Sequence, residues 1–345
     1  MDIDEPLNKI VTSVSNNTLN KYDKTMIYKL YDCHIDNIKE QLDTCGVAVI
    51  PNLIEGYELL RMQEGVWDTI EKLTSYMDIP VDRNDPDTWD NWYSLLPSHD
   101  MLLQTFSVGH SQFIWDIRQN PKVSNVFAKL WSCEPTELIS SFDAMSFHIP
   151  PEITGQGWYD DDDWYHVDAA YTRPDFECVQ GFVTGFDINE GDATLTVLEG
   201  SHKYHQDIRT KFNITSDNDW FRLNEEQLDF YKENGCNRMN VKASAGSLVL
   251  WDSRTVHCGM KPLKTRKAAN FRLVTYMCMT PREWCSENVL QIRRNALTDL
   301  YMTSHCPHRP KLFPKVPNVD KDYIPYVPKI PRPNLTELGK KLSGF

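Results

Sequence analysis

The sequence predicts a mainly β fold, a sandwich or barrel with flanking helices, and three observations support this class. Residues 137–279 consist mostly of short alternating or β-branched runs that are broken by turn residues. Apolar residues recur at helical spacing in the segments that precede this block. Hydrophobic residues make up 41% and charged residues 25% of the 345 residues, ordinary values for a globular chain that buries a large core.

The individual elements follow from the period of their apolar residues and from the turn residues between them. The segment 46–54 holds a short β-branched run that is stopped by Pro51 and Asn52, which predicts a strand here. The segment 80–100 is rich in Pro, Asp and Trp and predicts a long surface loop. Helices are expected over residues 26–45, 55–77, 120–133 and 224–235.

The two ends of the chain differ from the middle in composition. Residues 1–24 are polar and predict a flexible N-terminal arm. Residues 25–306 are expected to form a single domain. The prolines of residues 307–345 forbid a helix or a central strand, so this extension is expected to wrap the surface in extended conformation.

Charge and cysteine usage exclude several classes of protein. The net charge of −13 and the pI of about 5.2 disfavour nucleic acid and anionic membranes as partners. No apolar run is long enough to span a bilayer, and the N-terminus has no signal-peptide pattern. The nine cysteines form no C-x-x-C pair and fit reduced thiols. We therefore expect a cytoplasmic protein without a membrane span.

The sequence YHVD places a histidine and a carboxylate two residues apart. On a strand, His166 and Asp168 would point to one face, while Tyr165 and Val167 point to the other. A second histidine, His257, follows the apolar run SLVLW later in the β block. Two histidines and one carboxylate make a facial triad that leaves metal positions open, as in non-haem Fe(II) oxygenases. An H-x-D pattern alone is weak, because it recurs by chance.

The order of several motifs makes the pattern more specific. CGVAVIPNLI, DWYHVDAAY, FDINEGDATLTVLEGSHKYH and LVLWDSRTVHCG follow one another between about residue 30 and 280. In this order they resemble the phytanoyl-CoA dioxygenase-like branch of the Fe(II)/2-oxoglutarate oxygenases. The resemblance implies a double-stranded β-helix, that is, a jelly-roll core similar to that of cupins. It also implies iron ligation by His166, Asp168 and His257, with 2-oxoglutarate and O2 as cosubstrates.

The resemblance further implies an arginine for the far carboxylate of 2-oxoglutarate. Arg272 is the first choice because NFRLVTY is strand-like, although it lies further beyond His257 than the family pattern has it. Arg266, in the loop-like KPLKTRK, is the alternative. Thr194 and Ser146 are candidates for hydrogen bonds to the cosubstrate, although local hydrogen bonding within the sheet explains them equally well.

Three further residues are candidates for the wall of the substrate pocket. His148 alternates with Ser146 on its strand, and Gln180 shares a strand face with Phe182 and Thr184. Trp164 has the parity of His166 and could form an aromatic wall, although packing in the core is the commoner role of such a tryptophan.

The remaining charged clusters favour structural roles. Asp160 to Asp163 lack the spacing of a calcium loop, and mutual repulsion favours a solvated, exposed segment. The pairs His202/His205 and His305/His308 are expected to be structural, and Cys258 would point away from His257.

The resulting hypothesis is an oxidoreductase, a dioxygenase that hydroxylates a C–H bond of a small-molecule or lipid-like substrate and releases succinate and CO2. A protein substrate stays open. One alternative is a DNA or RNA alkyl-base dioxygenase, because Arg266 and Arg272 form an R-x5-R pattern, but the acidic charge makes nucleic acid an improbable partner. The other alternative is a catalytically silent jelly-roll binding module.

Overall fold

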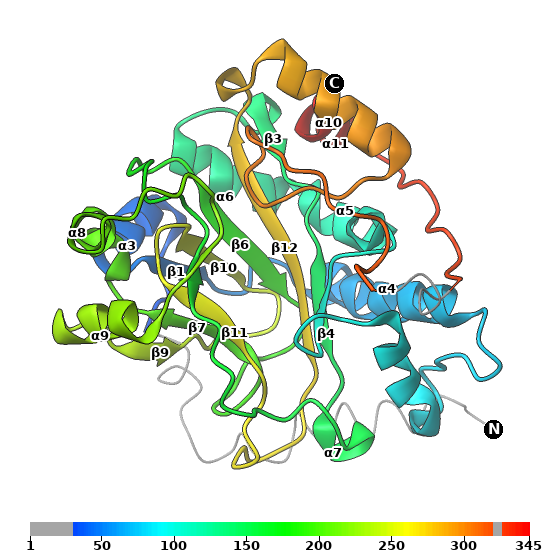
Figure 1. Cartoon of the computed structure of the whole chain (residues 1–345). Helices are drawn as coiled ribbons and strands as arrows, with labels where there is room; N and C mark the ends of the chain where they lie inside the picture. Colours follow the sequence, from blue (N-terminus) through cyan, green and yellow to red (C-terminus); the bar gives the residue numbers. More distant parts are fainter. Residues whose placement is uncertain (1–29, 320–325) are drawn as a thin grey trace.

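The computed structural model describes residues 30–319 and 326–345, and it consists of two antiparallel β-sheets that face each other with helices outside them (Figure 1). This arrangement confirms the predicted fold class. The arm expected at residues 1–24 lies outside the described residues. Within the described residues, no helix is both long and apolar enough to cross a membrane.

The larger sheet has seven strands in the order β1-β10-β6-β12-β4-β2, and β3 pairs with the far end of β12. The long central strand β12 pairs with both β6 and β4. The strands are β1 (Val47–Ile50), β2 (Leu102–Leu103), β3 (Leu138–Ser140), β4 (Met145–His148), β6 (Val179–Thr184), β10 (Leu248–Asp252) and β12 (Arg272–Pro281).

The smaller sheet has five strands in the order β8-β5-β11-β7-β9. The chain passes from one sheet to the other between successive strands from β4 to β7 and again from β10 to β12, which is the winding of a double-stranded β-helix. The strands are β5 (His166–Val167), β7 (Thr194–Leu198), β8 (Phe221–Arg222), β9 (Arg238–Asn240) and β11 (His257–Met260).

Alternate side chains of each strand enter different cores. Val249 and Trp251 of β10 belong to the cluster between the sheets, whereas Leu248 and Leu250 belong to the cluster under the helices. On the smaller sheet, Val167 packs into a third cluster, on the outer face. Because a register shift of one residue would exchange these faces, burial on both sides fixes the register of the strands.

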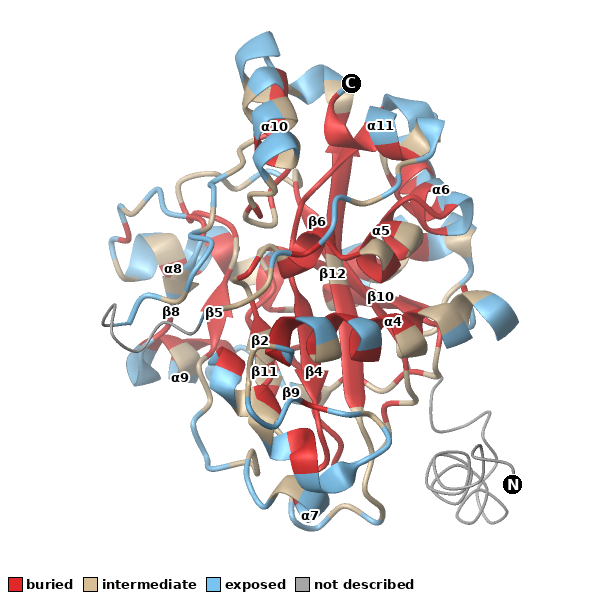
Figure 2. Ribbon diagram, turned by 90° about the vertical axis from the view of Figure 1, so that its right-hand side faces the viewer, coloured by how far each residue is buried: buried red, intermediate tan, exposed pale blue. Residues whose placement is uncertain are grey.

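Helices cover the outer face of the larger sheet. The helix residues that are buried against this sheet are drawn in red in Figure 2. The face of α4 that meets the sheet includes Val66, Ile70 and Leu73, which are fully buried. Two further helices, α8 and α9, lie beside the smaller sheet (Figure 1). The helices are α3 (Ile38–Cys45), α4 (Gly56–Thr74), α5 (Gln112–Arg118), α6 (Pro121–Trp131), α7 (Pro151–Thr154), α8 (His205–Lys211), α9 (Glu225–Glu233), α10 (Glu287–Asp299) and α11 (Glu337–Ser343).

Gly46 makes the abrupt change from α3 to β1 possible. Its φ of 78° lies in the left-handed region, and its amide donates to the carbonyl of Leu42 to close the helix. A Cβ at this position would collide with the side chains of Thr255 and His202. The close approach of the first strand to the turn before β11 therefore requires glycine here.

The segment 80–100 lies largely at the surface, as its composition predicts, but it is more regular than a loop and buries several side chains. Nearly half of it is a 3₁₀ segment, Pro86–Leu95, in which Trp89 and Trp92 are buried. Trp89 packs against Trp67, and Trp92 lies edge-on to Phe147. The burial of two large rings outweighs the polar residues between them, which the Pro and Asp content does not reveal.

The C-terminal extension is also more regular than its prolines indicate. After the last proline, Thr336 caps α11 by accepting a hydrogen bond from the amide of Gly339. Leu342 of this helix is fully buried, and α11 packs on β3 and α10. The division into arm, domain and extension remains a prediction.

Three buried histidines make the stability of the fold sensitive to mild acid. Burial lowers the pKa of His110 to about 3 and the pKa values of His148 and His205 to about 4. The unfolded chain takes up these protons near pH ~6.5, so below that pH it binds more protons than the folded chain. Their contribution to stability is therefore present above pH ~6.5 and is lost as the pH falls towards the folded-state pKa values.

We expect the free energy of unfolding to fall by up to roughly 1.4 kcal/mol per pH unit for each of these histidines. Urea unfolding of the metal-free protein between about pH 7.5 and 5, where ordinary carboxylates stay ionised, measures this slope. A free energy of unfolding that does not change over this range would contradict the assignment of neutral, buried imidazoles.

Candidate metal centre

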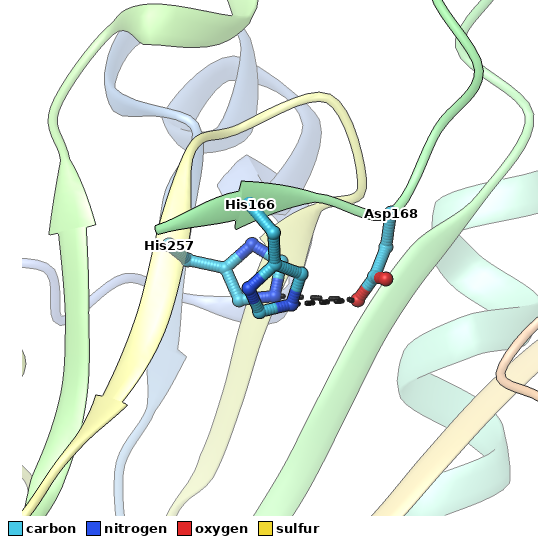
Figure 3. Close-up of side chains that lie close together, drawn as sticks. All are labelled: His166, Asp168 and His257. Atoms are coloured by element: carbon cyan, nitrogen blue, oxygen red, sulfur yellow. Dashed lines mark ion pairs between the residues drawn. The ribbon is translucent and has the colours of Figure 1, made fainter. Parts of the chain in front are cut away.

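The two histidines and the aspartate of the H-x-D…H pattern meet between the sheets. His166 on β5 pairs directly with His257 on β11, and Asp168 follows the end of β5 (Figure 3). As the alternation predicts, Val167 points into the outer cluster while its neighbours point inwards. The three side chains come from segments about ninety residues apart and converge on one point (Figure 3).

The donor atoms of these residues are close enough to share one ion. One atom from each side chain lies within 4.8 Å of the other two, which makes this a group of the size that holds a metal. The Nε2 atoms of His166 and His257 lie 3.5 and 3.3 Å from Oδ2 of Asp168. The side chains are 5%, 5% and 11% exposed, so the centre is shielded from bulk water.

Backbone carbonyls fix the orientation of both imidazoles. Nδ1 of His166 lies 3.1 Å from the carbonyl oxygen of Trp164, and Nδ1 of His257 lies 2.9 Å from that of Thr255. Because a carbonyl only accepts, each Nδ1 carries the proton and each Nε2 presents a lone pair to Asp168. Two lone pairs and a carboxylate oxygen repel one another unless a cation lies between them. The donor set therefore fits a divalent metal such as Fe(II).

The electrostatics of the centre favour the ligand forms of these groups. Burial, followed by the neighbouring His257, lowers the pKa of His166 and keeps this imidazole neutral. Burial opposes ionisation of Asp168, but the imidazoles around it, with His305 the largest cause, hold the pKa of this carboxyl well below its usual range. These directions favour a neutral His166 and an ionised Asp168, the forms in which the two side chains bind a metal.

Gln180, an expected pocket residue, lies directly against the carboxylate. Its amide Nε2 donates to Oδ2 of Asp168 over 2.9 Å. His305, which sequence reasoning treated only as part of a structural pair, lies 2.9 Å from the carbonyl oxygen of Asp168 through its Nε2. No spacing rule connects either residue with Asp168, because both contacts depend on how distant segments pack.

Aromatic side chains surround the histidine of β5. The ring of Trp164 stacks on His166 with centroids 4.7 Å apart, and His99 also stacks on this tryptophan, at 4.1 Å. Trp220 lies 5.9 Å from His166 and is 48% exposed. Trp164 therefore lies where the aromatic wall was expected, whereas the contributions of His99 and Trp220 had no signal in the sequence.

Arg272 is a buried cation with neutral partners. Its guanidinium bonds to Ser146 Oγ at 3.4 Å, the Ala193 carbonyl at 3.1 Å and Tyr276 Oη at 3.5 Å. The residue is only 4% exposed, and within residues 30–319 and 326–345 no carboxylate lies at ion-pair distance from it. Burial of an unpaired cation is costly, so this position favours an anionic ligand.

Arg266 differs from Arg272 because its charge is already matched. It forms an ion pair with Glu152 and a second one, at 3.3 Å, with Asp192. Its side chain is only 1% exposed, although it lies in the loop-like segment KPLKTRK. The two carboxylates explain its burial without a ligand.

The other two polar candidates have different neighbours. Thr194 donates to the carbonyl of Val241 and shares the strand parity of Leu198, which packs into the outer cluster, so the structure does not bring it to Arg272. His148 lies directly opposite Arg272 in the β4–β12 ladder. Its Nε2 lies 3.0 Å from the Gly157 carbonyl, and its buried Nδ1 has no hydrogen-bond partner among the described residues.

The aspartate run is exposed, as predicted, but most of it is ion-paired rather than free in solvent. Asp160 lies 2.9 Å from Lys261, which follows β11. Asp162 and Asp163 pair with Arg222 of β8 and Arg238 of β9, at 3.4 and 2.7 Å. The loop before His166 is thereby tied to three strands of the smaller sheet, although each exposed pair contributes only ~0.2–1 kcal/mol.

The remaining histidine pairs do not form a metal centre. His202 and His205 bond to the carbonyls of Asp43 and Ala170, at 3.1 and 3.2 Å. His308 contacts Thr280, and Cys258 packs into the outer cluster, away from His257. Among the described residues, the two histidines of β5 and β11 with Asp168 are the one group whose donor atoms could hold an ion.

Comparisons with known proteins find a curated relative and solved structures of the same fold. A curated relative, Ava biosynthesis cluster protein O of Aspergillus versicolor, is 26% identical over 284 residues, covering 80% of this chain and 87% of the relative. A hypothetical protein of Escherichia coli superposes with a TM-score of 0.58 at 13% identity, over 91% of this chain and 85% of that one. A protein of Salmonella typhimurium LT2 gives 0.57 at 13% identity, over 91% and 86%. These two structures share the fold.

The family comparison covers the metal centre itself. The model of the phytanoyl-CoA dioxygenase (PhyH) family matches residues 43–261, more than half of the chain, and this segment includes His166, Asp168 and His257. Both arginines lie beyond its end. From the family match and the facial triad together, the chain belongs to the phytanoyl-CoA dioxygenase family and is an Fe(II)- and 2-oxoglutarate-dependent oxygenase with these three residues as its iron ligands.

Proposed function

We propose that this oxygenase hydroxylates a C–H bond of a small-molecule or lipid-like substrate. The observation that carries the proposal is the pairing of two features between the same sheets: a facial triad with open positions, and a buried arginine without an acidic partner. One side of such a site holds the metal, and the other holds an anionic cosubstrate. When bound, iron and 2-oxoglutarate supply the oxidising power, with succinate and CO2 as coproducts.

In this proposal Arg272 binds the far carboxylate of 2-oxoglutarate. The guanidinium can exchange its weak contacts with Ser146 and Tyr276, at 3.4 and 3.5 Å, for a two-pronged bond to a carboxylate. Ser146 then stays within reach as a hydroxyl donor. His148, opposite Arg272 in the ladder, offers an unpartnered buried nitrogen to the same region.

The aromatic groups beside His166 are the first candidates for contacts with the substrate. Trp164 shields one face of the imidazole, and Trp220 adds an exposed apolar surface on a neighbouring loop. Flat apolar walls suit a small organic substrate better than a charged polymer. The A. versicolor relative is named for a biosynthesis cluster, which supports a small-molecule substrate over a protein side chain.

The ion pairs of Arg266 argue against the nucleic-acid alternative. This alternative needs both arginines of the R-x5-R pattern as ligand-binding groups, but Arg266 is held by Glu152 and Asp192. The net charge of −13 also disfavours a phosphate backbone.

Product analysis tests the proposal. The protein is incubated with Fe(II), 2-oxoglutarate, O2 and a pool of small apolar metabolites, and succinate and substrate masses are followed together. Hydroxylation predicts one equivalent of succinate for each product that has gained one oxygen atom. Succinate formation with a product of unchanged mass would instead indicate an isomerisation such as epimerisation and would refute hydroxylation.

A further inference from the structure

Asp168 is the iron ligand whose position the local strand defines least. It lies after the end of β5, a strand of only two residues, and His166 makes the single register contact between β5 and β11. The ladder therefore orients His166 and His257 but leaves the aspartate to other contacts. Its own amide donates to the carbonyl of Ser253 over 2.9 Å.

A histidine from the C-terminal segment supplies the second backbone contact. Nε2 of His305 lies 2.9 Å from the carbonyl oxygen of Asp168, and because a carbonyl only accepts, Nε2 carries the proton and donates. The other ring nitrogen, Nδ1, lies 4.0 Å from Oδ1 of the same residue, too far for a direct hydrogen bond. Both nitrogens of one ring thus face the same aspartate, and the His305 side chain is only 12% exposed.

The segment that carries His305 is anchored on both sides of it. The amide of Thr303 donates to the carbonyl of Phe142, and Phe313 donates to Met302, so the chain doubles back around the histidine. Cys306 packs against Cys178 and Cys278 next to β6 and β12. A ring that is held this firmly can impose a position on the group it contacts.

Different groups surround Asp168 on different sides. Oδ2 faces both imidazoles and accepts from Gln180, whereas a cavity on another side of Asp168 is lined by Ser253, His305 and Cys306 and by neither metal-binding histidine. The contacts of His305 and Ser253 with the Asp168 main chain therefore leave Oδ2 free to face the metal.

We propose that His305 is a positioning residue of the iron centre. Through its bond to the carbonyl of Asp168, the segment 302–313 fixes the main chain of the carboxylate ligand and so sets the direction in which Oδ2 points. Loss of a hydrogen-bond partner of a ligand typically costs about 10–100-fold in metal affinity. The proposal rests on the metal centre and not on the identity of the substrate.

Anaerobic calorimetric titration of the metal-free protein with Fe(II) tests this role. His305→Leu fills the space without a donor, and we expect its Kd for Fe(II) to rise about 10–100-fold. His305→Gln keeps an amide N–H that can reach the carbonyl, so we expect it to bind iron within about threefold of the wild type. If leucine does not fit, His305→Ala gives the same comparison. Melting temperatures identify variants that have lost the fold.

His308→Leu is the matched control, because it lies in the same segment and contacts Thr280 rather than Asp168. We expect near wild-type iron affinity for it. The proposal is overturned if His305→Leu binds Fe(II) as tightly as the wild type, or if the Leu, Gln and His308 variants weaken binding equally. A wild type that binds iron but forms no oxygenated product would refute the proposed function and leave this inference intact.

Discussion

Replacing His166 or Asp168 with alanine is expected to abolish formation of the iron–2-oxoglutarate complex and, with it, succinate production. Each change removes one of the three donors that converge within 4.8 Å. The loss of iron affinity should exceed the roughly 10–100-fold that removal of a ligand's hydrogen-bond partner costs. Calorimetric Fe(II) titration and succinate quantification measure the two effects separately.

His34→Ala is a suitable control because this histidine is exposed, with 71% of its side chain accessible. The control should bind iron and turn over like the wild type. Iron-dependent succinate formation by the His166 and Asp168 variants at the wild-type rate would show that the metal lies elsewhere.

Replacing Arg272 with alanine is expected to raise the Kd for 2-oxoglutarate by about 100-fold or more. A hydrogen bond to a charged group contributes ~1.5–3 kcal/mol, and a two-pronged contact makes two of them. Arg272→Lys should restore only part of the affinity, because an ammonium is a point charge without the fork geometry. Anaerobic titration of the Fe(II)-loaded protein with 2-oxoglutarate measures the affinity.

Arg266→Ala is the matched variant for this prediction. It leaves Glu152 and Asp192 without their cation, so we expect a lower melting temperature and a 2-oxoglutarate affinity close to that of the wild type. If Arg266→Ala loses 2-oxoglutarate binding while Arg272→Ala keeps it, the proposed roles of the two arginines are reversed.

Periodicity predicted the β fold and placed His166 and Asp168 on one strand face, and the family resemblance then implied that they bind a metal together with His257. On a strand, residues two apart share a face, so YHVD and the strand ending before His257 define the triad once the order of motifs is considered. The support of Asp168 by Gln180 and His305 was not predictable in this way. Those contacts join residues from separate elements, and neither has a fixed spacing from the ligand.

Predictions of exposure from local composition were incomplete where large rings are buried or where charges have partners on distant segments. In the Pro- and Asp-rich segment 80–100, Trp89 and Trp92 are buried, although many of the polar residues around them are exposed. Asp160 and Asp163 are adjacent to basic groups of other strands, which a run of four carboxylates does not reveal. Long-range partners decided both cases, and a local window of sequence does not contain them.

Anaerobic absorption spectroscopy tests the central claim most directly. Fe(II) and 2-oxoglutarate are added to the wild-type protein in the absence of O2, and the visible metal-to-ligand charge-transfer band of a chelated 2-oxo acid is recorded. An oxygenase with His166, Asp168 and His257 as iron ligands predicts a saturable band that requires both additions and disappears in the His166→Ala variant. A wild-type protein that binds Fe(II) without developing this band, or an unchanged band in His166→Ala, would contradict the account.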